Sequence, residues 1–247
     1  MSSGSGKLKV FLGDLHIHTC LSPCADLEMS PRSIVKTAKD KGLDFIAICD
    51  HNSAENAPAA KKAGKREGIG VIGGMEVTSS EEVHILALFD KDKDLRTFQK
   101  VVYLHLPETK DERLYEDQVV VNEEDEVIRF NRKLLIGASD MTIHAVVDQV
   151  HALGGVAIAS HVDRQGFGII GQLGFIPEDL HLDAIEITDR RKTESLREGR
   201  TFPVIFSSDA HYLGDVGKGH TAFLLERMTV EELRNAFEGR DGRRVIT

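Results

Sequence analysis

The sequence predicts an α/β fold built on a parallel β-sheet, and three observations lead to this prediction. Short runs of apolar and β-branched residues recur along the chain, and several are apolar almost throughout, which is typical of parallel strands covered on both faces. Stretches with helical patterning separate these runs. The chain has 247 residues, a length at which an α/β barrel can form one domain. The expected strands are Val10–Ile17, Phe45–Cys49, Ile69–Ile72, Val83–Phe89, Val156–Ser160, Ala184–Ile187, Val204–Ser207 and Thr221–Leu225.

Four segments between these runs are predicted to be helices. The first begins after Ser30, a good N-cap that is followed by a proline, and it ends at Gly42. The second covers residues 53–68. The third covers residues 141–155 and ends in two glycines, and the fourth covers residues 229–239 near the end of the chain.

Residues 91–141 interrupt the alternation of strands and helices. Within them, "QVVVNEEDEVIRFN" predicts a β-hairpin around an acidic turn. We therefore expect a single barrel domain over residues 8–247, with an insertion at about 91–141 that forms a lid or an edge excursion. Residues 1–7, "MSSGSGK", lack the apolar centre of a secretory signal and are expected to be a flexible or expression-derived tail.

The composition favours a cytoplasmic protein that acts on small molecules. The formal net charge of −9 argues against binding of long nucleic acid, although bound cations would still permit a small phosphorylated substrate or a nucleotide. The chain has no tryptophan to act as a stacking platform. No apolar run approaches the roughly 18 residues needed to cross a bilayer, so no membrane partner is expected. The oligomeric state is left open.

The three cysteines, Cys20, Cys24 and Cys49, contain no CxxC pair, which indicates a reducing compartment rather than a disulfide framework. Each is expected to be a small buried apolar side chain.

Histidines and carboxylates recur near the ends of the predicted strands. His16 and His18 are two residues apart on an extended chain, so both side chains project from the same face. Comparable positions are Asp50, His51, Glu76, His84, His161, Glu186, Asp209 and His211. Active sites lie at the carboxyl end of the strands in barrels, and buried unpaired carboxylates are costly, so we expect a metal centre there. These ligand types suit zinc, manganese or iron, and their number favours two or three divalent ions per chain.

Several segments of the chain resemble the ordered motifs of the PHP (polymerase and histidinol phosphatase) domain family. They are "DLHIHTCLSPCAD", "IAICDHNSAEN", "GMEVTSSEEVHIL", "IASHVDR" and "SSDAH", and the resemblance spans residues 10 to about 225. It implies a distorted (β/α)7 TIM-like barrel with a di- or trinuclear metal centre that hydrolyses phosphoesters.

The resemblance also implies three metal positions. The first would be held by His16, His18, Glu76 and Asp209. Glu76 would bridge to the second, which His84 and His161 complete. The third would be held by Asp26, His51 and His211. Many relatives have Ser-Asp-Gly soon after the two histidines, whereas this chain has "SPCAD", so Ser22 and Pro23 would have to turn the chain to return Asp26 to the cluster.

We therefore predict a metal-dependent phosphoesterase in which a metal-bound hydroxide attacks a small phosphomonoester, a nucleotide or a short oligonucleotide end. His211 would protonate the leaving group. Arg164 would bind phosphate oxygens, unless it pairs with a nearby carboxylate, and Arg190 or Arg191 could also reach an anionic substrate.

The roles of two carboxylates stay open, as do two other functions. Asp50 would be either a ligand or an acceptor that orients an imidazole, and Glu186 either a ligand or base or a structural partner of "HVDR". A C–N hydrolase of amidohydrolase type is one alternative function, although no lysine ends a predicted strand here. A non-catalytic PHP regulatory module is the other, although it would have lost ligands. His105, His144, His151, His181 and His220 are not expected to be ligands.

Overall fold

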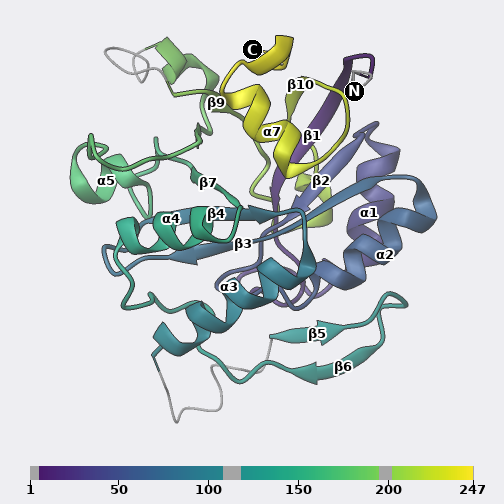
Figure 1. Ribbon diagram of the computed structural model, residues 1–247. Coiled ribbons are helices and arrows are strands. Elements are labelled where there is room, and N and C mark those ends of the chain that lie inside the picture. Colours follow the sequence, from purple (N-terminus) through teal and green to yellow (C-terminus); the bar gives the residue numbers. More distant parts are fainter. Residues whose placement is uncertain (1–5, 108–117, 195–201, 247) are drawn as a thin grey trace.

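The computed structural model describes residues 6–107, 118–194 and 202–246. Its main element is a nine-stranded sheet in the order β11-β10-β1-β2-β3-β4-β7-β8-β9, which curls into a nearly closed barrel (Figure 1). The predicted α/β barrel class is therefore confirmed. The strands of this sheet are β1 (Lys9–Ile17), β2 (Phe45–Ile48), β3 (Gly70–Thr78), β4 (His84–Phe89), β7 (Val156–Ala159), β8 (Ala184–Glu186), β9 (Val204–Ile205), β10 (Thr221–Leu225) and β11 (Arg244–Ile246).

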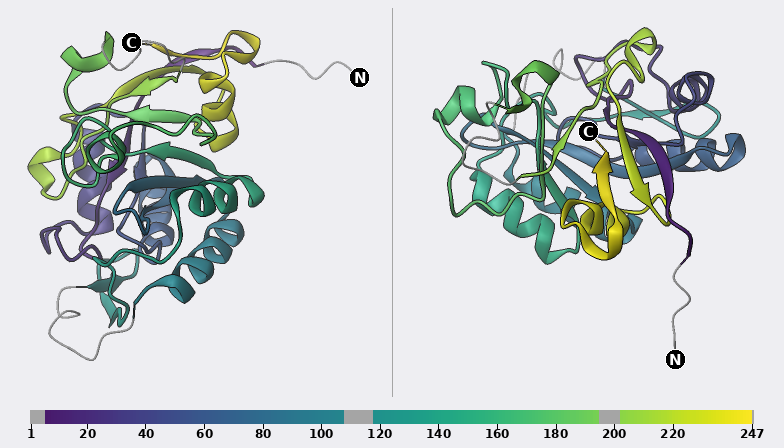
Figure 2. Two further views of the ribbon diagram at one scale, coloured as in Figure 1. Left: turned by 90° about the vertical axis from the view of Figure 1, so that its left-hand side faces the viewer. Right: turned by 90° about the horizontal axis from the view of Figure 1, so that it is seen from above.

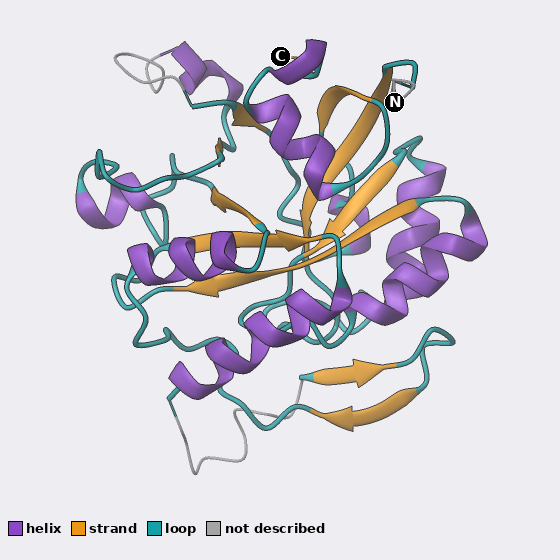
Figure 3. Cartoon of the chain, viewed as in Figure 1, coloured by secondary structure: helices purple, strands orange, loops and turns teal. Residues whose placement is uncertain are grey.

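Helices surround the sheet, and a separate hairpin follows the third of them. The helices are α1 (Pro31–Asp40), α2 (Ala57–Glu67), α3 (Asp92–His105), α4 (Ile143–Ala152), α5 (Ile169–Leu173) and α7 (Val230–Phe237), with 3-10 turns at Arg190–Lys192, Leu213–Asp215 and Arg240–Gly242. The predicted hairpin is present as β5 (Val119–Val121) and β6 (Val127–Phe130), a two-stranded sheet apart from the barrel (Figure 3). Helix α3 lies within the range expected as an insertion, yet it packs on β3 and β4 as an outer helix of the barrel.

The sheet is not wholly parallel, and the expectation of a parallel sheet was wrong for two of the predicted strands. β4 runs antiparallel to both β3 and β7, and β10 runs antiparallel to β1. The connection between β3 and β4 is residues 79–83, which is far too short for the crossover that two parallel strands need. As a result, the first residue of β4 lies at the same rim as the last residues of β1 and β3.

Strand β1 closes the barrel because it changes partner along its length. Its first five residues pair with β10, whereas Ile17 forms a parallel bridge with Ala210, beyond the end of β9. The His18 N–H donates to the Ala210 carbonyl oxygen at 3.0 Å. The chain after β9 is thereby placed directly beside the end of β1.

The two faces of the sheet build two apolar layers. On β2, Ile46 and Ile48 belong to the layer that packs against α1, α2, α3 and α4. Phe45 and Ala47 face the interior of the curled sheet, together with the apolar side of α7. Helix α7, yellow in Figure 2, packs on β10 and β11, far along the chain from the other helices. The buried polar side chains of His16, His18, Glu76 and His161 lie at one rim of the barrel interior.

Asn52 ties the loop after β2 to two other segments. Its buried side-chain amide donates to the carbonyl oxygens of Leu135 at 2.8 Å and Gly137 at 2.9 Å, and its Oδ1 accepts from the Thr78 N–H at 3.1 Å. Asn52 also has a positive φ of 49°, which an asparagine tolerates better than an alanine.

We expect Asn52→Ala to lower the free energy of unfolding by about 2–4 kcal/mol, because three hydrogen bonds are lost and the buried Leu135 carbonyl and Thr78 N–H keep no side-chain partner. Urea unfolding followed by circular dichroism measures the change. Gln172→Ala, which removes an exposed amide on α5, is the control and should stay within about 0.5 kcal/mol of the parent. Equal stability of both variants would show that Asn52 does not anchor this loop.

Of the expected tail, only Gly6 and Lys7 lie within the described residues, and both are exposed. Among the helices in the described part of the chain, none has the length and apolar character that a membrane crossing requires.

Candidate metal centre

A bulge in β1 aims both histidines of "HIH" into the barrel. Asp14 pairs with Ile46 and Ile17 with Ile48, so three steps on β1 oppose two steps on β2. Such an extra residue shifts the alternation of side chains and re-aims those that follow it. Leu15 accordingly belongs to the interior apolar cluster, while Ile17 packs with the helices, and His16 and His18 share the polar rim.

Glu76 lies inside β3 and not after it, because the strand continues through the glycine pair where it was expected to end. Gly73 and Gly74 are there for packing: a Cβ at Gly74 would lie 2.7 Å from the Ala87 carbonyl oxygen, and one at Gly73 would lie 2.8 Å from Leu95. Met75 and Val77 point to the outer helices, so Glu76 points inward.

Two turns with positive φ complete the rim. His161 follows β7 with φ 29° and Asp209 follows β9 with φ 49°, and neither is a glycine. Residues held in this sparsely populated region cluster at functional sites, where the surrounding structure fixes them. Both side chains reach the centre from strand ends that the sequence had identified.

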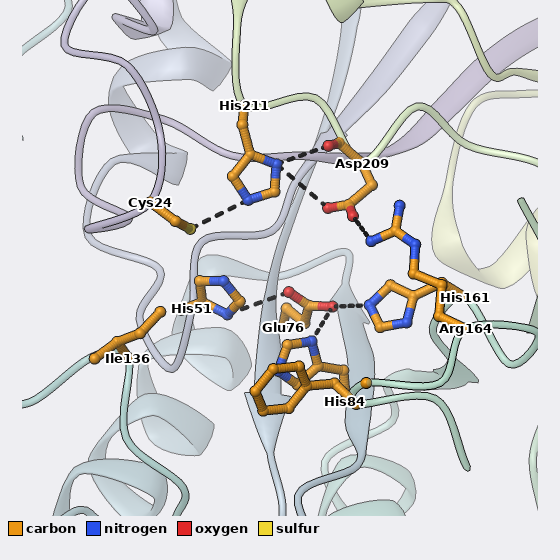
Figure 4. Close-up of a pocket in the computed structure, with 11 residues that line it drawn as sticks. Cys24, His51, Glu76, His84, Ile136, His161, Arg164, Asp209 and His211 are labelled. Carbon is orange, nitrogen blue, oxygen red and sulfur yellow. Dashed lines mark hydrogen bonds and ion pairs between the residues drawn. The ribbon is translucent and has the colours of Figure 1, made fainter. Parts of the chain in front are cut away.

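Glu76 is the centre of the cluster. Nitrogens of five imidazoles lie 2.9–3.4 Å from its carboxylate oxygens, and these belong to His16, His18, His51, His84 and His161. Asp209 lies on the other side of the histidine pair, with its Oδ1 3.3 Å from His16 Nε2 and 3.2 Å from His18 Nε2. The interactions with His51, His84 and His161 are visible in Figure 4.

The cluster opens into a cavity of about 220 Å³. Of the metal-ligand candidates, the cavity wall contains His51, Glu76, His84, His161, Asp209 and His211, and it also contains Cys24, Ile136, Arg164, Gly166 and Phe167 (Figure 4). Ile136 comes from the segment that follows the β5–β6 hairpin, so the predicted insertion reaches the mouth of the site. The Phe167 ring stacks on His84 with 4.5 Å between the ring centroids.

The charges of the cluster suit a cation. Burial alone would lower the pKa of His16, but the negative charges of Glu76, Glu186 and Asp209 outweigh burial and raise that pKa well above its ordinary value. Burial alone would raise the pKa of Glu76, but the imidazoles of His84 and His16 hold it well below its ordinary value. A positive charge on His16 and His18 is therefore favoured beside the ionised carboxylates of Glu76 and Asp209.

Unsatisfied buried atoms show that metal ions fit these residues. His51 Nδ1, His84 Nδ1 and Glu76 Oε1 are buried and make no hydrogen bond, although they face one another across the cluster. Buried polar atoms in native proteins nearly always have a partner, and imidazole and carboxylate groups are the donors that zinc, manganese and iron accept. The cluster is therefore able to bind metal.

The structure brings most of the predicted ligands together, in three overlapping sets whose ligand atoms lie within 4.8 Å of one another. The first set is the predicted one: His16, His18, Glu76 and Asp209. The second joins Glu76 and His84 to His51, while the expected His161 places its Nε2 3.3 Å from Glu76 Oε1. The third contains His18, Cys24, His51 and His211.

Asp26 does not join the cluster. Its side chain is exposed and its Oδ1 accepts a hydrogen bond from the Glu28 N–H at 2.8 Å. Cys24 takes its place, with its Sγ 3.1 Å from His211 Nε2. Cys24 is exposed, in contrast to the buried Cys20 and Cys49, so the expectation of burial was wrong for this cysteine alone. The departure of "SPCAD" from the usual Ser-Asp-Gly was the only sequence signal that pointed to it.

Two buried carboxylates, Glu186 and Asp50, orient His16 and His18 through the Nδ1 atoms of their rings. Glu186 accepts from His16 Nδ1, at 3.1 Å to Oε1. Asp50 accepts from the Ser22 hydroxyl at 2.8 Å, and that hydroxyl lies 2.9 Å from His18 Nδ1. Such partners fix the orientation of a ligating imidazole. For Asp50 the geometry supports the orienting alternative. For Glu186 it supports the structural alternative, because Glu186 Oε1 also accepts a hydrogen bond from the His161 N–H of "HVDR" at 3.2 Å.

The three arginines differ in position. Arg164 Nη1 lies 2.5 Å from Asp209 Oδ2 in the cavity wall, so the carboxylate partner weighed in the sequence is present. Arg190 lies over the Phe206 ring, 4.0 Å from its centroid, and Arg191 pairs with the adjacent Asp189. Arg190 and Arg191 are not among the described residues that line the cavity.

Four of the five histidines not expected to be ligands have partners elsewhere. His105, His144 and His151 pair with Asp140, Asp179 and Asp183, and His220 bonds to the Gly217 carbonyl oxygen. His181 and these four lie outside the three ligand sets found among the described residues.

Comparison with known families finds two matches along the chain. The profile of the PHP domain matches residues 14–164, and the profile described as PHP-associated matches residues 188–241. The first match contains every proposed ligand of "DLHIHTC", "CDH", "GMEV" and "ASH", and the second contains Asp209 and His211.

Similar curated proteins match only part of the chain. An uncharacterized protein of Methanocaldococcus jannaschii is 38% identical over 84 residues, which are 31% of this chain and 48% of that protein. A 5'-3' exoribonuclease of Haemophilus influenzae is 37% identical over 82 residues, 32% of this chain and 29% of that protein. The matches thus span about half or less of the curated relatives.

Among solved structures, endonuclease Q of Pyrococcus furiosus matches 96% of this chain and 58% of its own, with a TM-score of 0.73 and 20% identity. Endonuclease Q in complex with a 27-mer duplex that carries an abasic lesion at the active site matches with a TM-score of 0.72. At this identity the likeness shows the fold. The hydrolytic reaction class predicted from the sequence is confirmed at the level of the family.

The expectation that long nucleic acid is excluded was wrong, because a protein of the same fold holds a 27-mer duplex at its active site. The net charge of −9 describes the whole chain, whereas a substrate contacts one face. Bound cations and Arg164 can reverse the sign at the cavity.

Proposed function

Because this chain belongs to the PHP domain family, we propose that it is a metal-dependent phosphoesterase whose active site is the cluster around Glu76. One observation carries the proposal: five imidazoles and two carboxylates converge at one rim of the barrel, with buried atoms that lack a hydrogen-bond partner. Without cations, the carboxylates in the cavity would repel a phosphate group.

Two or three divalent ions, of zinc, manganese or iron, are assigned to this centre. His16, His18, Glu76 and Asp209 would hold the first, and Glu76 with His84 and His161 the second. When bound, such ions polarise a phosphoryl group and lower the pKa of water. Glu186 orients the imidazole of His16 and the Asp50–Ser22 pair orients that of His18.

The tautomer of His211 suits a ligand better than an acid. Its Nδ1 lies 2.8 Å from the Asp209 carbonyl oxygen, which can only accept, so Nδ1 carries the proton and Nε2 offers a lone pair. Burial and the positive charge of His18 lower the pKa of His211, so the ring is neutral near pH 7. We therefore assign His211 to metal binding in place of leaving-group protonation.

Arg164 is the cation available to the substrate. Its side chain is 43% exposed at the mouth of the cavity, and its guanidinium pairs with one oxygen of Asp209. A guanidinium there can bind a non-bridging phosphate oxygen while Asp209 keeps its other oxygen toward His16 and His18.

The substrate class is a phosphate ester of a nucleotide, either free or within a nucleic acid strand. The Phe167 ring is stacked on His84 and is 44% exposed, so its free face can stack on a nucleotide base. The absence of tryptophan had argued against such a stacking platform. Ile136, 48% exposed, lines the same cavity.

The two alternative functions have less support. None of the described residues that line the cavity is a lysine, the residue that bridges metals in amidohydrolases. A non-catalytic module would lack ligands, whereas the first predicted set is complete in one cluster.

The test is an assay of chelator-treated protein to which manganese, zinc or iron(II) is returned. Substrates are bis(p-nitrophenyl) phosphate, p-nitrophenyl phosphate, p-nitroacetanilide as the C–N control, and end-labelled single-stranded and duplex oligonucleotides. We expect metal-dependent hydrolysis of a phosphate ester and none of the anilide. Metal-dependent cleavage of the anilide alone, or no metal-dependent activity on any ester, would contradict the proposal.

Glu186→Gln is expected to weaken metal binding about 10- to 100-fold, because the amide no longer supplies a charged acceptor to His16 Nδ1. Competition with a chromogenic chelator measures the affinity. Glu178→Gln, an exposed position, is the matched control and should bind metal as the parent does. Unchanged affinity in Glu186→Gln would assign Glu186 to folding alone.

A further inference from the structure

We propose that Cys24 is a thiolate ligand of the third metal position, where it replaces the expected Asp26 and acts with His51 and His211. This inference rests on the proposed function, because it concerns the same metal centre. It changes the chemistry of that centre from nitrogen and oxygen donors alone to a mixed site with sulfur.

The geometry places the thiol among ligands. Cys24 Sγ lies 3.1 Å from His211 Nε2, the nitrogen whose lone pair is free. Ligand atoms of Cys24, His51, His211 and His18 all lie within 4.8 Å of one another. Figure 4 shows Cys24, His51 and His211 around one side of the cavity. Bonds of about 2.3 Å to sulfur and about 2.0–2.1 Å to nitrogen are compatible with such spacing.

His51 points to a ligand independently of the cysteine. It is only 5% exposed, and its Nδ1 lies 3.2 Å from Glu76 Oε2 but forms no hydrogen bond. Buried imidazole nitrogens nearly always have a binding partner. None of the described residues forms a hydrogen bond with this nitrogen, so a metal ion fits as its partner.

The conformation of the loop after β1 determines whether Cys24 or Asp26 faces the cavity. The Asp26 N–H donates to the His211 carbonyl oxygen at 2.9 Å, and the Cys20 N–H donates to the Met29 carbonyl oxygen at 2.8 Å. With the loop pinned at both points, the Asp26 carboxylate turns outward to the Glu28 N–H, and the cysteine two residues earlier faces the cavity.

A thiolate changes which metal the third position selects. Soft sulfur ligands favour zinc and iron(II), whereas sites of carboxylate and imidazole also accept manganese. The chain as it stands should therefore prefer zinc or iron(II) at this position, and Cys24→Asp should shift the preference toward manganese.

The experiment replaces the bound ions with cobalt(II) and records the near-ultraviolet absorption band of a cobalt–thiolate bond in the full chain. We expect the band in the parent and in Asp26→Asn, and its loss in Cys24→Ala, which keeps the buried Cys20 and Cys49. As a second readout, zinc should slow modification of Cys24 by a thiol reagent about tenfold or more, because a metal-bound thiolate is withheld from the reagent.

Four results would overturn the inference. A band that survives in Cys24→Ala would place the thiolate elsewhere, and loss of the band in Asp26→Asn together with a thiol unprotected by zinc would restore Asp26. Hydrolysis with bound metal but no thiolate band would refute the role of Cys24 and leave the proposed function intact. Failure to bind any metal would refute both.

Discussion

Glu76→Gln will reduce metal-dependent hydrolysis by about a thousandfold or more and will lower the metal content of the purified protein. The carboxylate of Glu76 faces nitrogens of five imidazoles at 2.9–3.4 Å, so it is the group that the first two proposed metal positions would share. An amide has the same shape but carries no charge and offers one oxygen in place of two. It cannot hold two cations.

Elemental analysis and the phosphodiester assay measure this result together. Glu178→Gln makes the same chemical change at an exposed position and should leave both quantities unchanged. Circular dichroism checks that the variant is folded, which we expect because glutamine is isosteric with glutamate. A folded Glu76→Gln protein with full metal content and full activity would contradict the assignment of the active site.

Removal of metal by a chelator is expected to lower the thermal midpoint of unfolding by about 8–16 °C for each filled site. An ion present at a thousand times its Kd stabilises the folded state by about 4 kcal/mol, and each kcal/mol shifts the midpoint by about 2–4 °C in a chain of this length. The physical reason is that the folded chain holds the carboxylates of Glu76 and Asp209 beside the imidazoles of His16 and His18, so a cation would bind the folded state and not the unfolded one.

Thermal unfolding scans with chelator, and then with excess zinc or manganese, measure the shift. The Glu76→Gln variant is the control, since its response to metal should be much smaller than that of the parent. A midpoint that is the same with chelator and with either metal would show that the cluster does not bind ions under these conditions.

The fold class could be read from the sequence because apolar runs of four to eight residues alternate with helical patterning. The direction of β4 within the sheet could not be read from the sequence. Its near-continuous apolar run, "HILALF", has the pattern of a parallel strand because both faces are buried, and burial does not report direction. Helix α3 was missed within the predicted insertion, although its buried residues Leu95, Phe98 and Val102 pack like those of the other outer helices.

Most of the cluster was also readable from the sequence, because histidines and carboxylates at strand ends have few structural uses. The exception was the loop after β1. Whether Cys24 or Asp26 faces His211 depends on two backbone hydrogen bonds to residues outside the motif, from Cys20 to Met29 and from Asp26 to His211. Spacing along the chain cannot supply that information.

By itself, the sequence determined the barrel class, the family and most of the histidines and carboxylates that gather in one cluster, since these depend on local pattern and on the order of motifs. The tertiary structure alone decided which strands run antiparallel, where β1 bulges, which thiol reaches the third position and where Arg164 lies. These features follow from contacts between residues far apart in the chain, such as Ile17 with Ala210 and Arg164 with Asp209. Their free energies depend on packing in three dimensions, which no local pattern of residues encodes.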